Sequence, residues 1–383
     1  MTSPALRLTR LTLTQFRNYQ QLVWRPGPQI SVLTGANGSG KTNLLEAISL
    51  LSPGRGLRGA RIGELLRHGA QGWAVAGRLN TPDGDCDIGT GTAPDGPTDR
   101  RVFRLDGAPP RSQAEVAVRC TCVWLTPQMD RLFQESASGR RRFLDRLVFA
   151  FEPSHAREVA AYDTAMASRN RLLGEGRADA AWLAGLEDAM ARHGVAVTAA
   201  RASVIAQLNA APAEGAFPAA GLALVCPVAA QLQGHPALAT EDWLRDALRA
   251  GRAVHAAAGS ARMGAHRADL AISDAATGLS AAQASTGQQK SLLLGIVLGH
   301  AQLLGRTRGF APLLLLDEPL VHLDQTRRGA LFDTLARLPA QCFLTGTDVA
   351  LFAPLAEVAD GFTVSDGVVA PWSLGTGSAI NQG

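Results

Sequence analysis

The chain has 383 residues, of which 46% are hydrophobic and 18% are charged, as in a globular protein with a substantial core. No apolar run is long enough to span a bilayer, and the first residues lack the apolar core of a secretory signal. The net charge of +4 permits a polyanionic partner without identifying one, because such binding depends on local clusters of charge.

The cysteine content predicts a cytoplasmic protein. An odd number of cysteines without a secretory signal indicates reduced thiols. Cys120 and Cys122 alternate as half-buried strand residues would, and no second Cys/His pair completes a metal site. The five cysteines are Cys86, Cys120, Cys122, Cys226 and Cys342.

The N-terminal third predicts strands and turns. Residues 5–16 alternate between apolar and polar side chains, residues 21–26 are β-prone, and residues 29–35 form a strand that runs into a glycine loop. Residues 83–110 are rich in Gly, Pro and Asp and predict hairpins or exposed loops, and residues 118–127 predict a buried strand.

The middle of the chain predicts helices. Leu183, Met190, Val197 and Val204 recur every seven residues, which favours a helix packed against residues 153–173 in a helical hairpin. A Pro/Gly-rich stretch at 210–236 interrupts this region, and α/β texture returns after Gly264. We therefore expect an α/β domain formed by residues 1–140 and 259–383, with a helical subdomain inserted at 141–258. The tail, residues 375–383, is expected to be disordered.

The segment GANGSGKT matches the G-x-x-x-x-G-K-[ST] phosphate loop and lies between a predicted strand and a predicted helix. The backbone N–H groups of such a loop surround phosphates, Lys41 reaches the β- and γ-phosphates, and Thr42 offers a hydroxyl to Mg²⁺. The predicted nucleotide-binding residues of this loop are Gly35, Ala36, Asn37, Gly38, Ser39, Gly40, Lys41, Thr42 and Asn43.

A second motif, LLLLDEP at residues 313–319, predicts a strand buried on both faces of a parallel sheet. Its carboxyl end presents Asp317 and Glu318, where such sheets bind ligands. We expect Asp317 to hold Mg²⁺ through water, and Glu318 to act as a general base on the attacking water. Glu318 and Lys41 are the predicted catalytic residues.

The sequence S-T-G-Q at 285–288, followed by a helix and then by this strand, resembles the signature-to-Walker-B order of ABC-type ATPases. The resemblance implies that Ser285, Gly287 and Gln288 bind the γ-phosphate of a nucleotide held by a second copy of the chain. It also makes Asp324 a D-loop residue. Gln128 is a candidate for the glutamine that senses Mg²⁺, with an ordinary surface glutamine as the alternative.

The family's switch histidine has no counterpart in this sequence. At its place stands LTGTD, so that Thr345 or Thr347 would be the γ-phosphate sensor.

Further motifs along nearly the whole chain resemble the RecF family. The chain departs from the family pattern at Ala265 and Ala268, where Pro and Asp are usual, and at Gln288, where Glu is usual. The motifs are LTLTQFRNY at 11–19, GANGSGKTNLLEAI at 35–48, LSPGRGLR at 51–58, TPQMDRLF at 126–133, RRRFLDRL at 140–147, GAHRADL at 264–270 and STGQQK at 285–290.

The resemblance implies an ABC-type ATPase head, with a mixed sheet and flanking helices, that carries an inserted helical lever arm. Its cofactors would be ATP and Mg²⁺, and it would form an ATP-dependent homodimer that binds DNA without sequence preference. It would act with RecR and RecO in loading RecA at single-strand gaps, with slow, DNA-stimulated ATP hydrolysis. The alternative function is a P-loop ATPase of transporter or phosphotransferase type that does not act on DNA.

Two features of the basic residues remain open in the sequence. Arg140, Arg141, Arg142 and Arg146 form the densest basic cluster, which predicts either DNA phosphate contacts or a structural ion-pair network. Only two of the 37 Lys and Arg residues are lysine, Lys41 and Lys290, and both lie in predicted ATP-site motifs. For Lys290, either a role at the site or chance placement remains.

Overall fold

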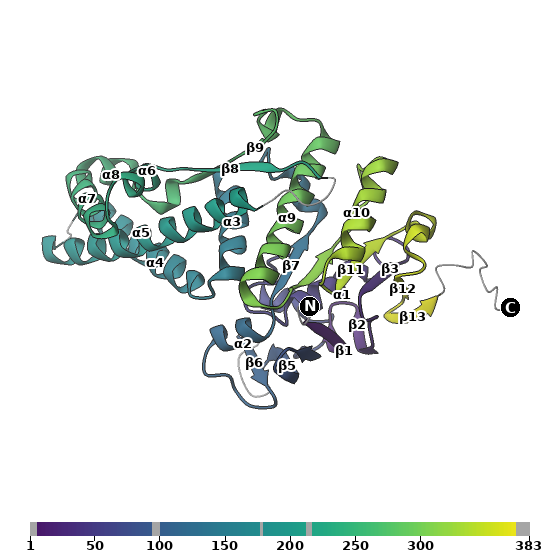
Figure 1. Cartoon of the computed structure of the whole chain (residues 1–383). Helices are drawn as coiled ribbons and strands as arrows, with labels where there is room; N and C mark the ends of the chain where they lie inside the picture. The colour runs from purple at the N-terminus through teal and green to yellow at the C-terminus, as the bar shows by residue number, and fades with distance from the viewer. Residues whose placement is uncertain (1–5, 94–99, 177–178, 212–216, 373–383) are drawn as a thin grey trace. The chain divides into compact units, whose positions relative to one another are not determined.

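The structure of the chain is a computed structural model that describes residues 6–93, 100–176, 179–211 and 217–372 (Figure 1). Its contacts divide the chain into two compact units. The α/β unit comprises Met1–Asp130, Ala213–Pro218 and Ser285–Gly383, and the helical unit comprises Arg131–Pro212 and Ala219–Ala284. The tail at 375–383, which we expected to be disordered, lies outside the described residues.

The helical unit is larger than the insertion at 141–258 that the sequence suggested, because it takes in residues on both sides. On the C-terminal side the reason is a strand pair: β9 (Asp269–Asp274) runs antiparallel to β8 (Ala220–Val225). Pairing with a strand from inside the insertion keeps residues after 258 in the helical unit.

The α/β unit is built around a six-stranded sheet in the order β13-β12-β3-β11-β10-β7. Neighbouring strands from β12 to β7 run parallel, and β13 is antiparallel at the edge. All four leucines of β10 are fully buried, as expected for a strand covered on both faces. The strands are β3 (Ile30–Thr34), β7 (Cys122–Leu125), β10 (Leu313–Leu316), β11 (Cys342–Gly346), β12 (Ala359–Ser365) and β13 (Val368–Trp372).

A second, antiparallel sheet of five strands completes the α/β unit, in the order β2-β1-β4-β5-β6. Strand β4 alternates strictly between buried and exposed residues and β1 does so in part, which is the period of a sheet with one face on a core. The hairpin of β5 and β6 falls in the Gly/Pro/Asp-rich stretch, as predicted. The strands are β1 (Arg7–Phe16), β2 (Tyr19–Trp24), β4 (Ala74–Thr81), β5 (Gly84–Thr92) and β6 (Arg101–Leu105).

Helices and short 3-10 turns connect these strands, and α9 lies beside β7 (Figure 1). The α-helices of the α/β unit are α1 (Lys41–Ser49), α2 (Gln113–Arg119), α9 (Thr286–Arg308) and α10 (Gln325–Arg337). The 3-10 turns are η1 (Ile62–Leu65), η2 (Pro127–Arg131), which ends at the first residue of the helical unit, and η5 (Val349–Leu355).

One predicted strand is partly wrong. Val118 and Arg119 belong to α2, Cys120 caps that helix, and the strand begins only at Cys122. Ser112 starts α2 by accepting a hydrogen bond from the Glu115 backbone N–H, a local capping signal that the apolar pattern of residues 118–127 obscured. The five cysteines are all free and buried.

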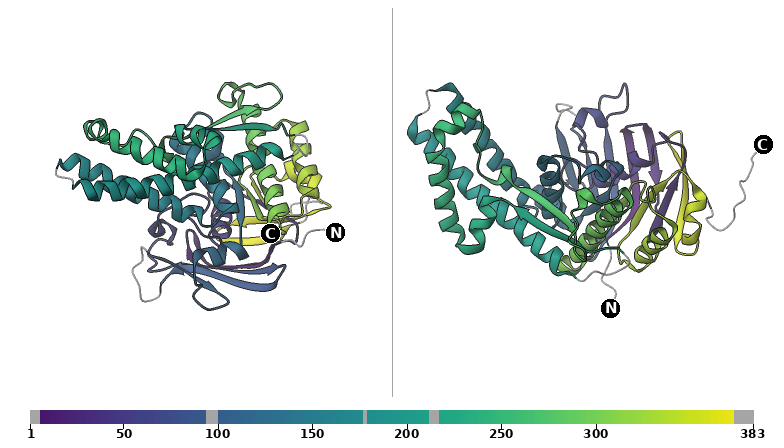
Figure 2. Two further views of the ribbon diagram at one scale, coloured as in Figure 1. Left: turned by 60° about the vertical axis from the view of Figure 1, so that its left-hand side comes forward. Right: turned by 90° about the horizontal axis from the view of Figure 1, so that it is seen from above.

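The helical unit contains the predicted hairpin: α4 (His155–Glu175) and α5 (Ala180–Ala210) run side by side (Figure 2). The predicted seam is confirmed, since Leu183, Met190, Val197 and Val204 are at most 4% exposed. The other helical elements are α3 (Ala137–Phe151), α6 (Pro227–Gly234), α7 (Ala237–Ala250), α8 (Arg252–Ala258), η3 (Ala265–Arg267) and η4 (Ala281–Gln283).

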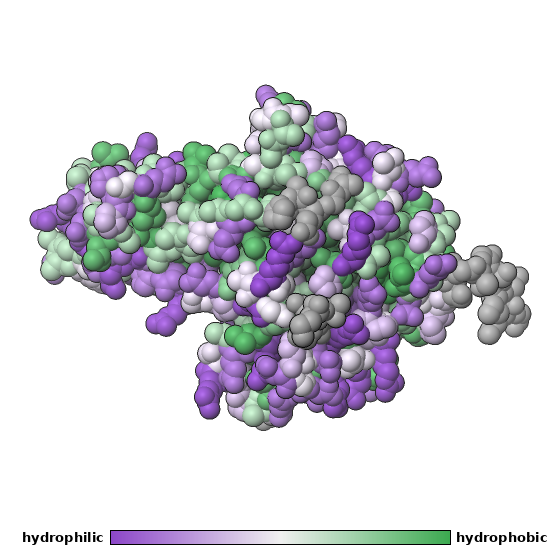
Figure 3. Space-filling model, viewed as in Figure 1, coloured by the Kyte–Doolittle hydropathy of each residue, from purple (hydrophilic) through white to green (hydrophobic). Residues whose placement is uncertain are grey.

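On the face drawn in Figure 3, hydrophilic residues are spread over the surface and hydrophobic residues occur in scattered patches. Among the residues that the structure describes, no helix combines the length and the apolarity needed to cross a membrane.

Candidate functional site

The predicted phosphate loop lies between β3 and α1, at the carboxyl edge of the six-stranded sheet. Two of its glycines are required by their surroundings. Gly35 has a φ of 147°, and a Cβ there would lie 2.4 Å from the Val364 carbonyl oxygen. Gly40 has a φ of 112°, and its Cβ would lie 2.7 Å from the Tyr19 hydroxyl. Any other residue would be strained and would push the loop away from its support.

Sequence reasoning missed the residues that support this loop. Asn18 Nδ2 donates to the Ser39 carbonyl at 3.2 Å, and the Tyr19 hydroxyl donates to the Gly40 carbonyl at 3.1 Å. Asn18 also accepts a hydrogen bond from Asn43 at 2.6 Å. These residues belong to the FRNY stretch, which contributed to the family resemblance without revealing its role.

The interior of the loop carries polar groups that suit an anionic ligand. Lys41 Nζ donates to the carbonyls of Gly35 and Ala36 at 2.8 and 3.0 Å. Within the described part of the chain, no hydrogen-bond partner is found for the buried Ser39 Oγ. Ala36, Asn37 and Gly38 form the exposed rim of the loop. A cation and an unpartnered hydroxyl behind an exposed rim fit a phosphate group.

Hydrogen bonds bring the phosphate loop and the carboxylate motif together. Thr42 Oγ1 donates to Asp317 Oδ1 at 2.9 Å. The same carboxylate oxygen accepts a hydrogen bond from Thr345 Oγ1 at 2.8 Å, and Asp317 is 3% exposed. Residues 275 positions apart in sequence therefore share one hydrogen-bonded cluster.

Glu318 comes directly after Asp317, and both its backbone conformation and the pKa of its carboxyl group are unusual. Its φ is 49°, in the left-handed region. Burial raises the pKa of Glu318 above its ordinary value; Lys41 opposes this, Asp317 adds to it, and Lys290 opposes it. Burial also lowers the pKa of Lys41, against the opposing charges of Glu318 and Asp317. A partly buried carboxylate with a raised pKa is suited to accept a proton.

The charges of both lysines of the chain thus act to lower the pKa of Glu318, and Lys290 also forms an ion pair with Asp130. Its Nζ donates to both carboxylate oxygens of Asp130, at 2.8 and 3.1 Å. The Lys290 side chain is 1% exposed and that of Asp130 is 19% exposed. Lys290 therefore ties the N-terminal part of α9 to η2, the turn that contains Gln128.

The predicted signature residues begin α9. Ser285 is the N-cap, and Ser285 and Gln288 form a reciprocal capping box. Both are exposed at the end of a 23-residue helix. A Cβ on Gly287 would lie 3.3 Å from the His322 carbonyl oxygen, so glycine lets α9 approach the segment that leads to Asp324. Asp324 itself caps α10 through the Arg327 N–H.

The remaining candidates for nucleotide contacts differ in exposure. Gln128 is exposed on η2, and Thr347 is exposed after β11. Thr345 is fully buried and already bonded to Asp317. The two threonines that the sequence offered as alternative sensors are therefore in different situations, and only Thr347 is open to a ligand.

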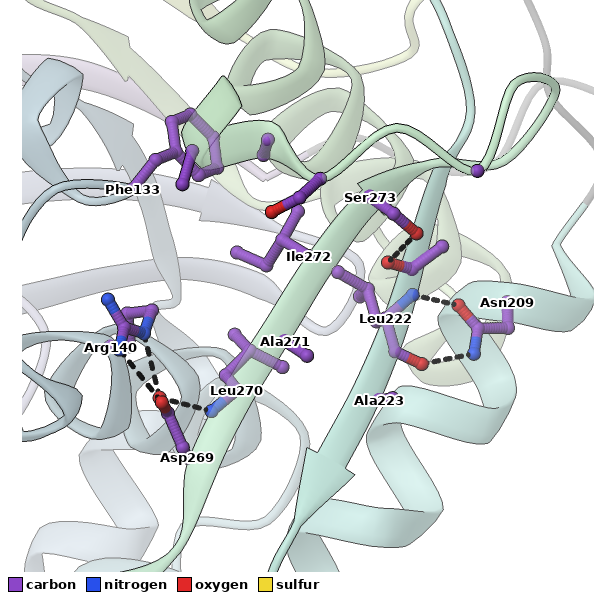
Figure 4. Close-up of a pocket in the computed structure, with 15 residues that line it drawn as sticks. Phe133, Arg140, Asn209, Leu222, Ala223, Asp269, Leu270, Ala271, Ile272 and Ser273 are labelled. Carbon is purple, nitrogen blue, oxygen red and sulfur yellow. Dashed lines mark hydrogen bonds and ion pairs between the residues drawn. The ribbon is translucent and has the colours of Figure 1, made fainter. Parts of the chain in front are cut away.

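Several arginines of the basic cluster make contacts within the protein. Arg140 forms a two-pronged ion pair with Asp269, at 2.7 and 2.8 Å, along the wall of a pocket of about 540 Å³ in the helical unit (Figure 4). Arg141 donates to the Ala268 carbonyl at 2.7 Å. Arg146 lies over the Phe143 ring at 5.3 Å, and burial lowers its pKa to about 10. Arg142 is exposed.

Two other arginines near the phosphate loop, Arg17 and Arg58, also have structural partners. Arg17 donates through Nε and Nη2 to the fully buried Glu46 of α1, at 2.8 Å each. Arg58 donates to Asn43 at 2.7 Å and approaches Glu46 at 3.4 Å. These contacts fix α1 behind the loop.

The donor set fits a magnesium ion that arrives with a nucleotide. The described residues contain no group of three or more His, Cys, Asp or Glu side chains that could hold a metal by themselves. A Thr hydroxyl beside one carboxylate, as in Thr42 and Asp317, suits Mg²⁺, which takes few protein ligands and completes its shell with phosphates and water.

A phosphate loop after β3 and two carboxylates after β10 of a mixed sheet with flanking helices define the class of ABC-type ATPase heads. Residues 7–81 match the family model described as the RecF/RecN/SMC N terminal domain. A solved Smc head domain from Pyrococcus furiosus, with a TM-score of 0.53 and 17% identity over 96% of this chain and 97% of its own, shares the fold.

More specific relatives cover nearly the whole chain. The DNA replication and repair protein RecF of Mesorhizobium japonicum is 46% identical over 95% of this chain and 97% of its own. That of Agrobacterium fabrum is 46% identical over 96% and 99%. A solved structure of the recombination mediator protein RecF with ATPrS in the RecFOR pathway has a TM-score of 0.85 at 23% identity, over 97% and 100%. The chain belongs to the RecF family.

Proposed function

We propose that this protein binds and hydrolyses ATP with Mg²⁺, and that the nucleotide controls a homodimer that holds DNA during repair. The observation that carries the proposal is the hydrogen bond from Thr42 to Asp317, which joins the phosphate loop to the strand that presents Glu318. Membership of a family of DNA replication and repair proteins supports it, as does a solved relative described as RecF-ATP.

In this proposal each residue of the site has a separate role. Lys41 exchanges the carbonyls of Gly35 and Ala36 for phosphate oxygens, since an ammonium binds either. Thr42 and Asp317 would hold Mg²⁺, which when bound would neutralise charge on the phosphates. Glu318 accepts a proton from the attacking water, and its raised pKa keeps it a strong enough base.

The signature residues serve the nucleotide of a second copy. Ser285, Gly287 and Gln288 lie at the start of α9, where N–H groups and the helix dipole favour an anion. Asp324 and Gln128 belong to the same composite site. A γ-phosphate gripped by both copies would favour the closed dimer, and hydrolysis would release it.

DNA would be held through phosphates and therefore without sequence preference. Arg142 is the member of the basic cluster best placed for such a contact, because it is exposed. We further propose that RecR and RecO are partners in loading RecA at gaps. Support comes from the family and from the solved relative in the RecFOR pathway.

Mixing two inactive variants tests the composite site. Lys41→Ala and Ser285→Ala should each lose ATP turnover, whereas a mixture should regain part of it, because a mixed dimer contains one site with neither substitution. Ser285→Ala also removes a helix cap, so Ser112→Ala, which removes the cap of α2, is the matched control and should keep turnover.

Sedimentation supplies the second measurement. Glu318→Gln should bind ATP without hydrolysing it and should therefore sediment as a dimer when ATP is present. A monomer at high protein concentration, or a Ser285→Ala variant with normal turnover, would contradict the composite site and favour an ATPase that works alone.

A further inference from the structure

Glu318 has a backbone conformation that needs support. Its φ of 49° lies in the left-handed region, which few residues other than glycine, asparagine and aspartate adopt. The residue is the second after the end of β10 and follows Asp317, so this conformation sets the direction in which the Glu318 side chain leaves the sheet. A strained backbone persists only where its surroundings hold it in place.

The Thr345 hydroxyl provides a contact to this backbone. Thr345 lies on β11, which pairs with β10, and its side chain is fully buried. The Glu318 backbone N–H donates to Thr345 Oγ1 at 2.9 Å, and Thr345 Oγ1 donates to Asp317 Oδ1 at 2.8 Å. The hydroxyl has one proton, the amide can only donate and an ionised carboxylate can only accept, so the direction of both bonds is fixed.

This arrangement separates Thr345 from the role of γ-phosphate sensor. The Thr345 hydroxyl donates its one proton to Asp317, and its oxygen accepts a hydrogen bond from the Glu318 backbone N–H. To donate to a phosphate, the fully buried Thr345 would have to give up its hydrogen bond to Asp317, which is 3% exposed, and leaving a buried acceptor without that partner is unfavourable.

We propose that Thr345 is a positioning residue for ATP hydrolysis, whose hydroxyl holds the Glu318 backbone in the left-handed conformation and thereby orients its carboxyl group. The inference rests on the proposed function, because it assigns Glu318 the role of general base. Asp317 and Glu318 depend on Thr345 to different degrees. Asp317 keeps a hydrogen bond from Thr42 when Thr345 is changed, whereas the Glu318 N–H loses the partner on which its backbone depends.

The consequence is a larger effect on turnover than on nucleotide binding. Without the hydroxyl, Glu318 can relax to a negative φ, which redirects its carboxyl group. Misplacement of a catalytic group by about 1 Å can cost on the order of 100-fold in rate. The phosphate loop and its contacts to Asn18 and Tyr19 do not involve Thr345 and should remain.

The test compares Thr345→Val, which removes the hydroxyl at nearly constant shape, with Thr345→Ser, which keeps it. The control is Thr334→Val, because Thr334 is also buried but its hydroxyl bonds only within α10, to the Ala330 carbonyl. The measurements are kcat and KM for ATP, and equilibrium binding of a fluorescent ATP analogue. Thr345→Val should lower kcat about 10- to 100-fold with little change in KM or binding, and Thr345→Ser should restore most of it.

Two outcomes would overturn the inference. One is turnover by Thr345→Val equal to that of Thr334→Val. The other is a loss of nucleotide binding that accounts for the whole loss of turnover, which would mean that Thr345 supports Asp317 instead. If Thr345→Val does not fold, Thr345→Cys, whose thiol is a weak hydrogen-bonding group, takes its place with the same expectations.

Failure of the inference differs from failure of the proposed function. If the unaltered protein hydrolyses ATP and Glu318→Gln does not, the proposed function stands whatever Thr345→Val does. If Glu318→Gln hydrolyses ATP normally, Glu318 is not the base, and the role assigned to Thr345 falls with it.

Discussion

Replacing Lys290 with methionine should destabilise the α/β unit strongly, although the change removes only one charge. Lys290 is 1% exposed and donates to both oxygens of Asp130, whose side chain is 19% exposed. The substitution leaves the Asp130 carboxylate without its partner. Breaking a buried ion pair from one side costs about 3–5 kcal/mol. The partial exposure of Asp130 favours the lower end, about 3 kcal/mol, or about 6–12 °C in Tm for a unit of this size.

The assay is chemical and thermal unfolding followed by circular dichroism, with a solvent-exposed ion pair as the control. Arg78 and Asp85 are 46% and 53% exposed, so Arg78→Met should cost less than about 1 kcal/mol. Combining Lys290→Met with Asp130→Leu should recover much of the loss, because the unpaired charge disappears. Equal losses for Lys290→Met and Arg78→Met would refute the reasoning.

Two further predictions concern the helical unit. In DNA binding, Arg142→Ala should reduce the slope of log affinity against log salt by about 0.7–0.9, the share of one phosphate contact. Arg140→Ala should mainly lower stability, because it leaves Asp269 unpaired; the opposite pattern in a salt titration would place the DNA contact on Arg140. The second prediction is that Asp145→Asn destabilises the protein at neutral pH and that this destabilisation disappears at low pH. Burial alone would raise the pKa of Asp145, but hydrogen bonds from His155 and Arg201 outweigh it and lower the pKa below its usual range. A lowered folded-state pKa stabilises the protein above the unfolded value, about 3.9. Unfolding measured from pH 7 down should thus show the difference from the unaltered protein shrinking below about pH 4, and a difference that grows in acid would contradict this sign.

Local sequence signals were sufficient for the elements with strong periodic or capping patterns. The glycine loop between a strand and a helix, the apolar run of β10 and the seven-residue repeat of α5 each carry their own signal within one continuous segment. The boundary at Cys120 was misjudged because the capping of α2 by Ser112 competes with an apolar pattern that suits a strand equally well.

By itself the sequence determined the class and the family of the protein and located the phosphate loop and the two carboxylates, because these depend on contiguous motifs. The tertiary structure decided which residues support these motifs. The burial of Thr345 on Asp317, the pairing of Lys290 with Asp130 and the support of the loop by Tyr19 join residues that are far apart in sequence. The contact of Thr345 needs β10 and β11 to be paired, that of Lys290 needs α9 to pack beside β7, and that of Tyr19 needs β2 to lie against the loop, so no spacing along the chain records them.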